Sequence, residues 1–125
     1  MHCPCGSNHS YEKCCGLYIS GNTSAPTADI LMRSRYTAYT LLHAEYLLAT
    51  WHSSTHPQAL NLTEDASKWI GLVVKCHRQQ DADHAIVEFV AKYKINSRAH
   101  RLHETSRFVR EEGRWFYLDG ELNEK

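Results

Sequence analysis

Four of the five cysteines of this 125-residue chain lie close together near its start, in the stretch CPCGSNHSYEKCCG. A disulfide between the adjacent Cys14 and Cys15 would need a distorted peptide. In a reducing compartment, thiols this close together more often bind metal than form disulfides. Four thiolates fill the tetrahedral coordination shell of Zn²⁺ in a closed structural site. We therefore predict one structural zinc ion, held by Cys3, Cys5, Cys14 and Cys15. An iron–sulfur cluster is the chemical alternative, although its usual C-x₂-C spacing is absent.

The charge balance and hydropathy of the chain favour a cytoplasmic protein. Its net charge does not attract it to membranes or nucleic acid. Fourteen basic and fourteen acidic residues cancel, so no global charge attracts an anionic partner. No apolar run approaches the ~20 residues that a membrane helix needs. The start MHCPCG lacks the basic flank and apolar core of a signal peptide.

Residues between the predicted ligands are typical of tight turns. Gly6 permits the backbone to fold back toward the sulfurs, and SYEKCC is typical of one helical turn that ends at Gly16. Four thiolates on one Zn²⁺ leave a net charge of about −2, which we expect Lys13 and backbone amides to offset in part.

The same stretch resembles the SEC-C motif, a small zinc-binding element found at the C-terminus of the translocation ATPase SecA and in other bacterial proteins. Cys3, Cys5, Cys14 and Cys15 match its four ligand positions. Asn8 stands where the motif usually carries glycine, and asparagine tolerates the left-handed backbone better than most residues. The resemblance implies a zinc-binding motif over residues 1–16. It also implies a docking surface for a protein partner, in secretion or ribosome-associated machinery, that would include His2, His9, Tyr11 and Lys13.

The rest of the chain is predicted to form one α+β domain. Residues 17–26 are typical of a linker, and Thr27 is a good N-cap for a helix over 28–43. A short helix is expected over 44–51, and residues 52–68 are predicted to be mostly irregular. Period-two patterns then predict strands over 69–80, 84–95, 101–111 and 114–120. This order predicts helices packed on one face of an antiparallel sheet over 27–121, with a tail at 122–125.

Two tight turns, NSRA and EEGR, predict the pairing of the last three strands. They place Glu88 opposite Arg107, Ala91 opposite Glu104 and Phe108 opposite Tyr117. One face of the sheet then carries most of the aromatic side chains, and we expect it to cover the helix face that bears Leu31, Arg35, Ala38, Tyr39 and Leu42.

Several segments are similar to the YchJ-like family of uncharacterised bacterial proteins: APTADILMRSRYTAY, YLLATWHSSTHP, WIGLVVK, VEFVAKYK and LHETSRFVREEGRWFYLDG. The similarity covers nearly the whole chain. It implies a nuclear-transport-factor-2-like (cystatin-like) cone, in which a curved antiparallel sheet cradles the helices. Longer relatives carry a second SEC-C motif after the last strand, which this sequence lacks. The family has no established reaction, so the resemblance implies no specific activity.

A pocket between helix and sheet is the natural ligand site of such a fold. The candidates to line it are Arg35, Tyr39, Trp51, Glu104 and Ser106. The structural alternative is that Arg35 and Glu104 neutralise each other in the core, and we favour it over a functional role.

Two classes of function follow. The favoured one is a non-catalytic binding or adaptor module that docks a protein through the zinc element. The alternative is a small acid–base enzyme with isomerase, dehydratase or hydrolase chemistry in the cone. His52 and His103 are more simply explained as ordinary hydrogen-bonded side chains, and Cys76 as a small apolar residue. The basic residues within 92–110 are interpreted as a solvated face, because no aromatic-interleaved basic motif accompanies them.

Overall fold

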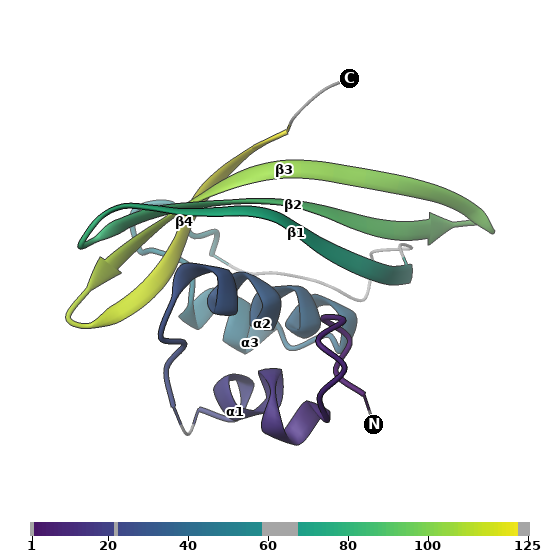
Figure 1. Ribbon diagram of the computed structural model, residues 1–125, viewed down its shortest axis with the longest axis horizontal. Helices are drawn as coiled ribbons and strands as arrows, with labels where there is room; N and C mark the ends of the chain where they lie inside the picture. The colour runs from purple at the N-terminus through teal and green to yellow at the C-terminus, as the bar shows by residue number, and fades with distance from the viewer. Residues whose placement is uncertain (1, 22, 59–67, 123–125) are drawn as a thin grey trace.

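The computed structural model describes residues 2–21, 23–58 and 68–122. A curved antiparallel sheet covers one side of the two middle helices, and the N-terminal element packs on their other side (Figure 1). This arrangement confirms the predicted α+β class. In chain order the elements are the 3₁₀-helix η1 (Tyr11–Lys13), α1 (Cys15–Ile19), α2 (Ala28–Thr40), α3 (Ala44–Ala49), β1 (Lys68–Asp81), β2 (His84–Ile95), β3 (Arg98–Glu111) and β4 (Arg114–Leu122).

The sheet is a simple meander, with strand order β1-β2-β3-β4 and every pair antiparallel. Its last two hairpins turn through two residues with positive φ, Asn96 and Ser97 in one and Glu112 and Gly113 in the other. Two-residue turns of this kind match the right-handed twist of the strands they join. The local sequence therefore indicates a tight turn in both hairpins.

Part of the predicted register is wrong. Arg107 pairs with Ile86 and Glu104 pairs with Phe89, whereas we expected Glu88 and Ala91 as their partners. The turn residues are Asn96–Ser97 rather than one position further along, which shifts the β2–β3 pairing by two. Because side chains alternate along a strand, a shift of two leaves every residue on its predicted face. The pairing of Phe108 with Tyr117 is confirmed.

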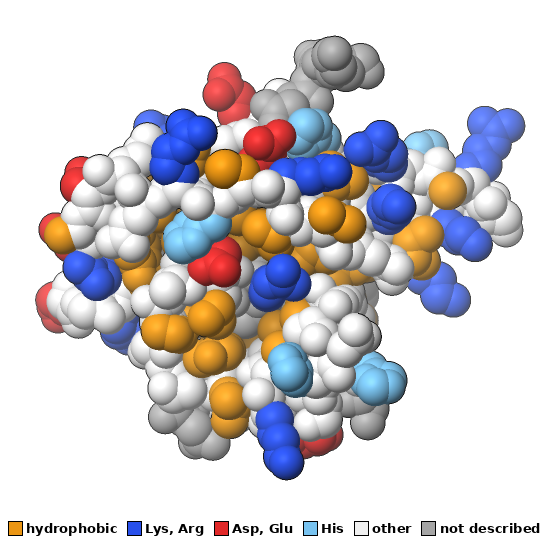
Figure 2. Space-filling model, viewed as in Figure 1, with side chains coloured by type: hydrophobic (Ala, Val, Ile, Leu, Met, Phe, Trp, Pro, Cys, Tyr) orange, Lys and Arg blue, Asp and Glu red, His pale blue; other side chains and the backbone are white. Residues whose placement is uncertain are grey.

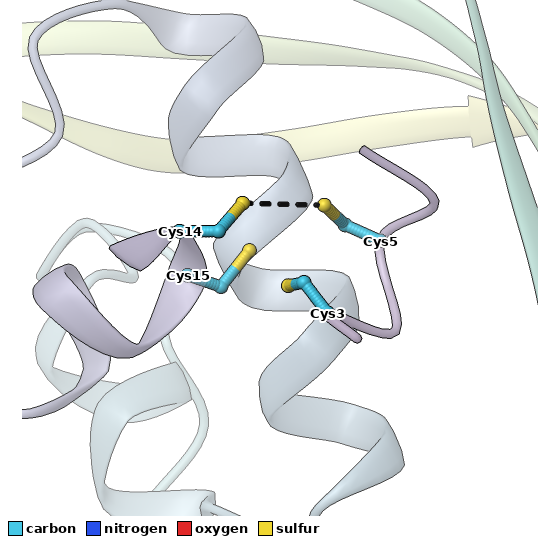
Figure 3. A group of neighbouring side chains, drawn as sticks. All are labelled: Cys3, Cys5, Cys14 and Cys15. Atoms are coloured by element: carbon cyan, nitrogen blue, oxygen red, sulfur yellow. Dashed lines mark hydrogen bonds between the residues drawn. The ribbon is translucent and has the colours of Figure 1, made fainter. Parts of the chain in front are cut away.

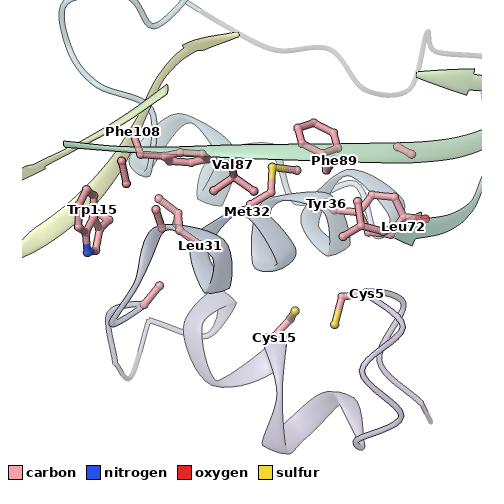
Figure 4. Close-up of a cluster of buried hydrophobic side chains, with 14 of the residues drawn as sticks. Cys5, Cys15, Leu31, Met32, Tyr36, Leu72, Val87, Phe89, Phe108 and Trp115 are labelled. Atoms are coloured by element: carbon pink, nitrogen blue, oxygen red, sulfur yellow. The ribbon is translucent and has the colours of Figure 1, made fainter. Parts of the chain in front are cut away.

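The main core lies between α2 and the concave face of the sheet. Leu31, Met32 and Tyr36 project from α2 toward Val87 and Phe89 on the sheet, and all five are buried (Figure 4). Fully burying a side chain of this size contributes ~1.5–3 kcal/mol, so this layer accounts for much of the stability.

The helix face predicted from the sequence extends too far. Leu42 lies beyond the end of α2 at Thr40 and is 55% exposed. Its positive φ of 62° takes the chain out of the helical conformation. The apolar face of α2 therefore ends with the helix.

The N-terminal element differs locally from the prediction. The helical turn does not end at Gly16, because α1 begins at Cys15 and continues through Gly16 to Ile19. Cys14, with φ −125° and ψ −115°, separates η1 from α1. A Cβ at position 16 would lie 2.7 Å from the carbonyl oxygen of Tyr11, so glycine permits close packing there rather than terminating the helix. The first residues of the predicted 17–26 linker are consequently helical.

None of the helices in the described ranges is both long and apolar enough to cross a membrane.

Candidate metal centre and cavity

The four N-terminal cysteines come together in space, as predicted. Their sulfur atoms all lie within 4.8 Å of one another, and they point toward a common centre from two segments of the N-terminal element (Figure 3). The sulfurs of Cys5 and Cys14 are 3.7 Å apart. Zn–S bonds of ~2.3 Å in a tetrahedron give an S–S edge of about 3.8 Å. The cluster therefore has the size of a tetrathiolate metal site.

Backbone hydrogen bonds fold the first cysteine pair into position. The amide of Cys3 donates to the carbonyl of His9 over 2.9 Å, and the amide of Gly6 donates to the carbonyl of Cys3 over 3.2 Å. Gly6 and Asn8 both have positive φ, of 84° and 68°. Asparagine is one of the few residues besides glycine that adopts this conformation readily. Asn8 thus preserves the turn in place of the glycine that the motif usually carries.

Helix α2 supplies the inner wall of the metal centre. The hydroxyl of Thr37, which is fully buried, lies 3.7 Å from the sulfur of Cys3. Arg33 donates from Nη1 to the carbonyl of Cys5 over 3.2 Å. Lys13, which we expected to offset the negative charge, is an exposed residue of η1. The sequence analysis did not connect Arg33 or Thr37 with the cysteines.

The thiols of the cluster differ in acidity. Hydrogen bonds, first from Cys15 and then from Ser7 and Cys3, lower the pKa of Cys5 to about 4 against the opposing effect of burial. The pKa of Cys15 is raised, first by its hydrogen bond to Cys5 and then by burial. Burial is the main cause that raises the pKa of Cys14. Hydrogen bonding within the cluster therefore favours a thiolate at Cys5, whereas burial opposes ionisation of Cys14 and Cys15.

A second candidate site lies on the other side of α2. A cavity of about 240 Å³ separates this helix from the concave face of the sheet. Four of the five predicted pocket residues line it: Arg35, Tyr39, Glu104 and Ser106. Trp51 does not line the cavity. Its ring stacks against Arg35, with the guanidinium carbon 5.1 Å from the ring centre.

Arg35 is buried but does not form the predicted ion pair with Glu104. Its Nη1 donates to the carbonyl oxygen of Leu47 and to the hydroxyl of Thr50, both over 2.7 Å. The guanidinium carbon also lies 4.5 Å from the ring centre of Tyr117. Burial lowers the pKa of Arg35, and nearby tyrosines and Glu104 oppose that effect. Arg35 and Glu104 therefore form no direct ion pair: the end of α3 takes the hydrogen bonds of the arginine, and Glu104 acts on its charge only from a distance.

Glu104 has its own local support on β3. One of its carboxylate oxygens accepts a hydrogen bond of 2.7 Å from the buried hydroxyl of Ser106. A Cβ at Gly120 would overlap that carboxylate, so the glycine on β4 makes room for it. Burial raises the pKa of the neighbouring Tyr117 hydroxyl well above its ordinary value. The cavity thus carries one acidic and one basic side chain on opposite walls.

Comparison with known proteins places the chain in a family. Residues 27–120 match the family model described as YchJ, middle NTF2-like domain. The chain belongs to this YchJ-like family. It is 54% identical over 123 residues to a UPF0225 protein of Methylibium petroleiphilum, covering 98% of this chain and 90% of that protein. It is 56% identical over 128 residues to a UPF0225 protein of Cupriavidus metallidurans, covering 98% and 89%.

Two solved structures show that the YchJ-like fold extends over the N-terminal element. A SEC-C motif containing protein from Rhodopseudomonas palustris aligns with a TM-score of 0.88 and 29% identity, covering 99% of this chain and all of that one. A SEC-C motif containing protein from Psychrobacter arcticus aligns with a TM-score of 0.81 and 28% identity, covering 100% and 84%. Both resemblances stated from the sequence, to the SEC-C motif and to the YchJ-like family, are confirmed.

The remaining sequence candidates of this YchJ-like protein have ordinary partners. Nε2 of His52 lies 2.8 Å from Glu111, and Nε2 of His103 lies 2.6 Å from Glu88. Cys76 is half-buried on β1 and lies apart from the cysteine cluster. These contacts explain the residues without a catalytic role.

Most of the basic residues within 92–110 are exposed. The two at the end of that range have acidic neighbours, Arg107 with Asp119 and Arg110 with Asp83. The others belong to the β2–β3 hairpin, and lysines and arginines gather at that end of the molecule (Figure 2). They are Lys92, Lys94, Arg98 and Arg101.

Proposed function

We propose that this YchJ-like protein is a non-catalytic binding module whose N-terminal element is built on one structural zinc ion. The observation that carries the proposal is the cluster of four sulfurs within 4.8 Å of one another. Zinc is the metal most often bound by four thiolates in a closed site. Four protein ligands leave no coordination position for water or substrate, which favours a structural role for the metal over a catalytic one.

The surroundings of the sulfurs fit that role. Cys3, Cys5 and Cys15 are buried, so a bound ion would be shielded from solvent. The hydroxyls of Ser7 and Thr37 lie beside the sulfurs of Cys14 and Cys3 and would stabilise their ionised forms. The same site needs reduced thiols, which supports a cytoplasmic location.

The function of the zinc element, in this proposal, is to dock a protein partner, in secretion or ribosome-associated machinery. Its outer surface exposes His2, His9 and Lys13, while its inner surface packs on α2. A metal-fixed surface loses little conformational freedom on binding, which favours affinity. The likeness to proteins described as SEC-C motif containing supports the same role.

Affinity capture with four forms of the protein tests the docking role. They are the wild type, Cys14→Ser, the surface variant His9→Ala/Lys13→Glu, and Lys75→Glu as a control at an exposed position on β1. We expect the same partner with the wild type and Lys75→Glu, and loss of that partner with the other two forms. Equal recovery with all four forms would refute docking through the zinc element.

The cavity supports a second function, the binding of a small molecule. It lies between α2 and the sheet and bears Arg35 and Glu104, whereas a purely structural core would fill that space. Acid–base catalysis, the alternative predicted from the sequence, would use Glu104 because it is the carboxylate that lines the cavity. One assay distinguishes ligand binding from catalysis: NMR follows a bound ligand over time. Turnover by the wild type that is lost in Glu104→Gln would establish an enzyme, and an unchanged ligand would establish binding alone.

A further inference from the structure

Arg35 makes no ion-pair contact with a carboxylate among the residues that the structure describes, and the charge of Glu104 acts on it only from a distance. The side chain is 3% exposed, and both acceptors of its Nη1 hydrogen bonds are uncharged, the carbonyl of Leu47 and the hydroxyl of Thr50. An arginine keeps its positive charge in a protein interior, and a buried charge without a counter-ion is costly. Since Arg35 also lines the cavity, a negatively charged group of a bound ligand would supply the missing counter-ion.

Glu104, on the facing wall of the cavity, requires a cationic partner. Its carboxylate accepts a hydrogen bond from the neutral hydroxyl of Ser106, and the described part of the chain provides no cation in ion-pair contact with it. A ligand that carried only an anion would be attracted by Arg35 and repelled by Glu104. A ligand with both a carboxylate and an ammonium group would satisfy both walls.

The rest of the cavity is suited to an apolar or aromatic body. Met32, Tyr36, Trp69, Phe89 and Leu102 line it. The rings of Tyr36 and Trp69 are already in an edge-to-face arrangement, with centres 6.0 Å apart. At ~30 Å³ per water molecule, 240 Å³ corresponds to about eight waters, which is the scale of a single amino acid rather than of a nucleotide.

We propose that the cavity binds a free α-amino acid with an aromatic or large apolar side chain. Its carboxylate pairs with Arg35, its ammonium group pairs with Glu104, and its side chain packs among the aromatic residues. This inference rests on the cavity being a ligand site, as proposed above, and it is independent of the zinc element.

Titration calorimetry on the zinc-loaded protein tests the proposal with four matched probes. L-phenylalanine carries both charged groups, 3-phenylpropionate only the carboxylate, 2-phenylethylamine only the ammonium group, and 3-phenyl-1-propanol neither. We expect L-phenylalanine to bind at least ~10-fold more tightly than each of the others, because each charged contact contributes at least that factor.

Glu104→Gln identifies the residue that recognises the ammonium group. The amide oxygen of glutamine can still accept the Ser106 hydrogen bond, so the cavity wall keeps its shape, and the thermal unfolding midpoint checks that the variant folds. We expect its affinity for L-phenylalanine to fall ~10-fold while its affinity for 3-phenylpropionate is retained or rises. An unchanged preference for L-phenylalanine would overturn the assignment of Glu104.

The outcomes also separate this inference from the proposed function. If 3-phenyl-1-propanol binds as tightly as L-phenylalanine, the cavity is a ligand site but the charge pairing is refuted. If none of the four probes binds at millimolar concentration, the amino-acid proposal is refuted. Neither result affects the zinc element, because the capture experiment uses residues on the other side of α2.

Discussion

Thr37 provides the sharpest test of how the body of the protein supports the proposed metal centre. Its hydroxyl lies 3.7 Å from the sulfur of Cys3, and its hydrogen bond to Cys15 opposes the rise in the pKa of that thiol, which is caused by Cys5 and burial. Thr37 is completely buried on α2, so water cannot replace the hydroxyl. Thr37→Val removes this donor and keeps the branched shape of the side chain.

The size of the effect follows from the chemistry of a hydrogen bond to a charged sulfur. Such bonds contribute ~1.5–3 kcal/mol, and loss of an outer-shell partner typically lowers metal affinity ~10- to 100-fold, which is about 1.4–2.7 kcal/mol. We therefore expect the zinc dissociation constant of Thr37→Val to rise ~10- to 100-fold. This dissociation constant is measured by competition with a chromophoric chelator over a range of chelator concentrations.

Two controls make the result specific to the hydroxyl. Thr37→Ser keeps the oxygen and should retain most of the affinity. Thr40→Val removes a neighbouring hydroxyl that bonds the carbonyl of Thr37 rather than a sulfur, and it should leave zinc binding unchanged. If Thr37→Val binds zinc as tightly as the wild type, α2 does not support the proposed metal centre through this hydroxyl.

Three further predictions concern packing, pH and metal removal. Gly16→Ala should lower the thermal unfolding midpoint because its Cβ would lie 2.7 Å from a backbone oxygen. The Cβ of Gly71→Ala would enter open space, so this control should leave the midpoint unchanged. Equal midpoints for the two variants would contradict close packing at Gly16. The hydrogen bond from Arg107 lowers the pKa of Asp119 below 3.8. The stability that this pair contributes is therefore present above pH ~3.8 and is lost as the pH falls through the pKa of Asp119 in the folded state. The difference in unfolding free energy between the wild type and Asp119→Asn should therefore shrink in acid. A difference that grows in acid would refute the stabilising role of the Arg107–Asp119 pair. With zinc bound, we expect a thiol reagent to modify Cys76 alone, and chelation should expose four more thiols; five reactive thiols before chelation would contradict a closed site.

The sequence predicted the elements of the fold because their signals are local. The change from helical to alternating periodicity marked the boundary between the helices and the sheet, and the turn residues Asn96 and Gly113 marked two hairpins. The β2–β3 register was wrong by two residues because NSRA allows two turn positions, and both place the same side chains on the concave face. Burial pattern alone therefore could not separate the two registers.

The candidate sites were predictable to different extents. The cluster of four cysteines was predictable because all four lie in one short segment, where spacing indicates geometry. The contributions of Arg33 and Thr37 could not be predicted, since they depend on how the N-terminal element packs on α2. The direct contacts of Arg35 could not be predicted for a related reason. Its hydrogen bonds go to the end of α3, and no periodicity in the sequence indicates where that helix crosses α2.

X-ray absorption at the zinc edge of natively purified protein tests the central claim most directly, together with its metal content. We expect one zinc ion per chain, surrounded by four sulfur atoms at ~2.3 Å. Nitrogen or oxygen in the first coordination shell, iron in place of zinc, or protein purified without bound metal would each contradict it.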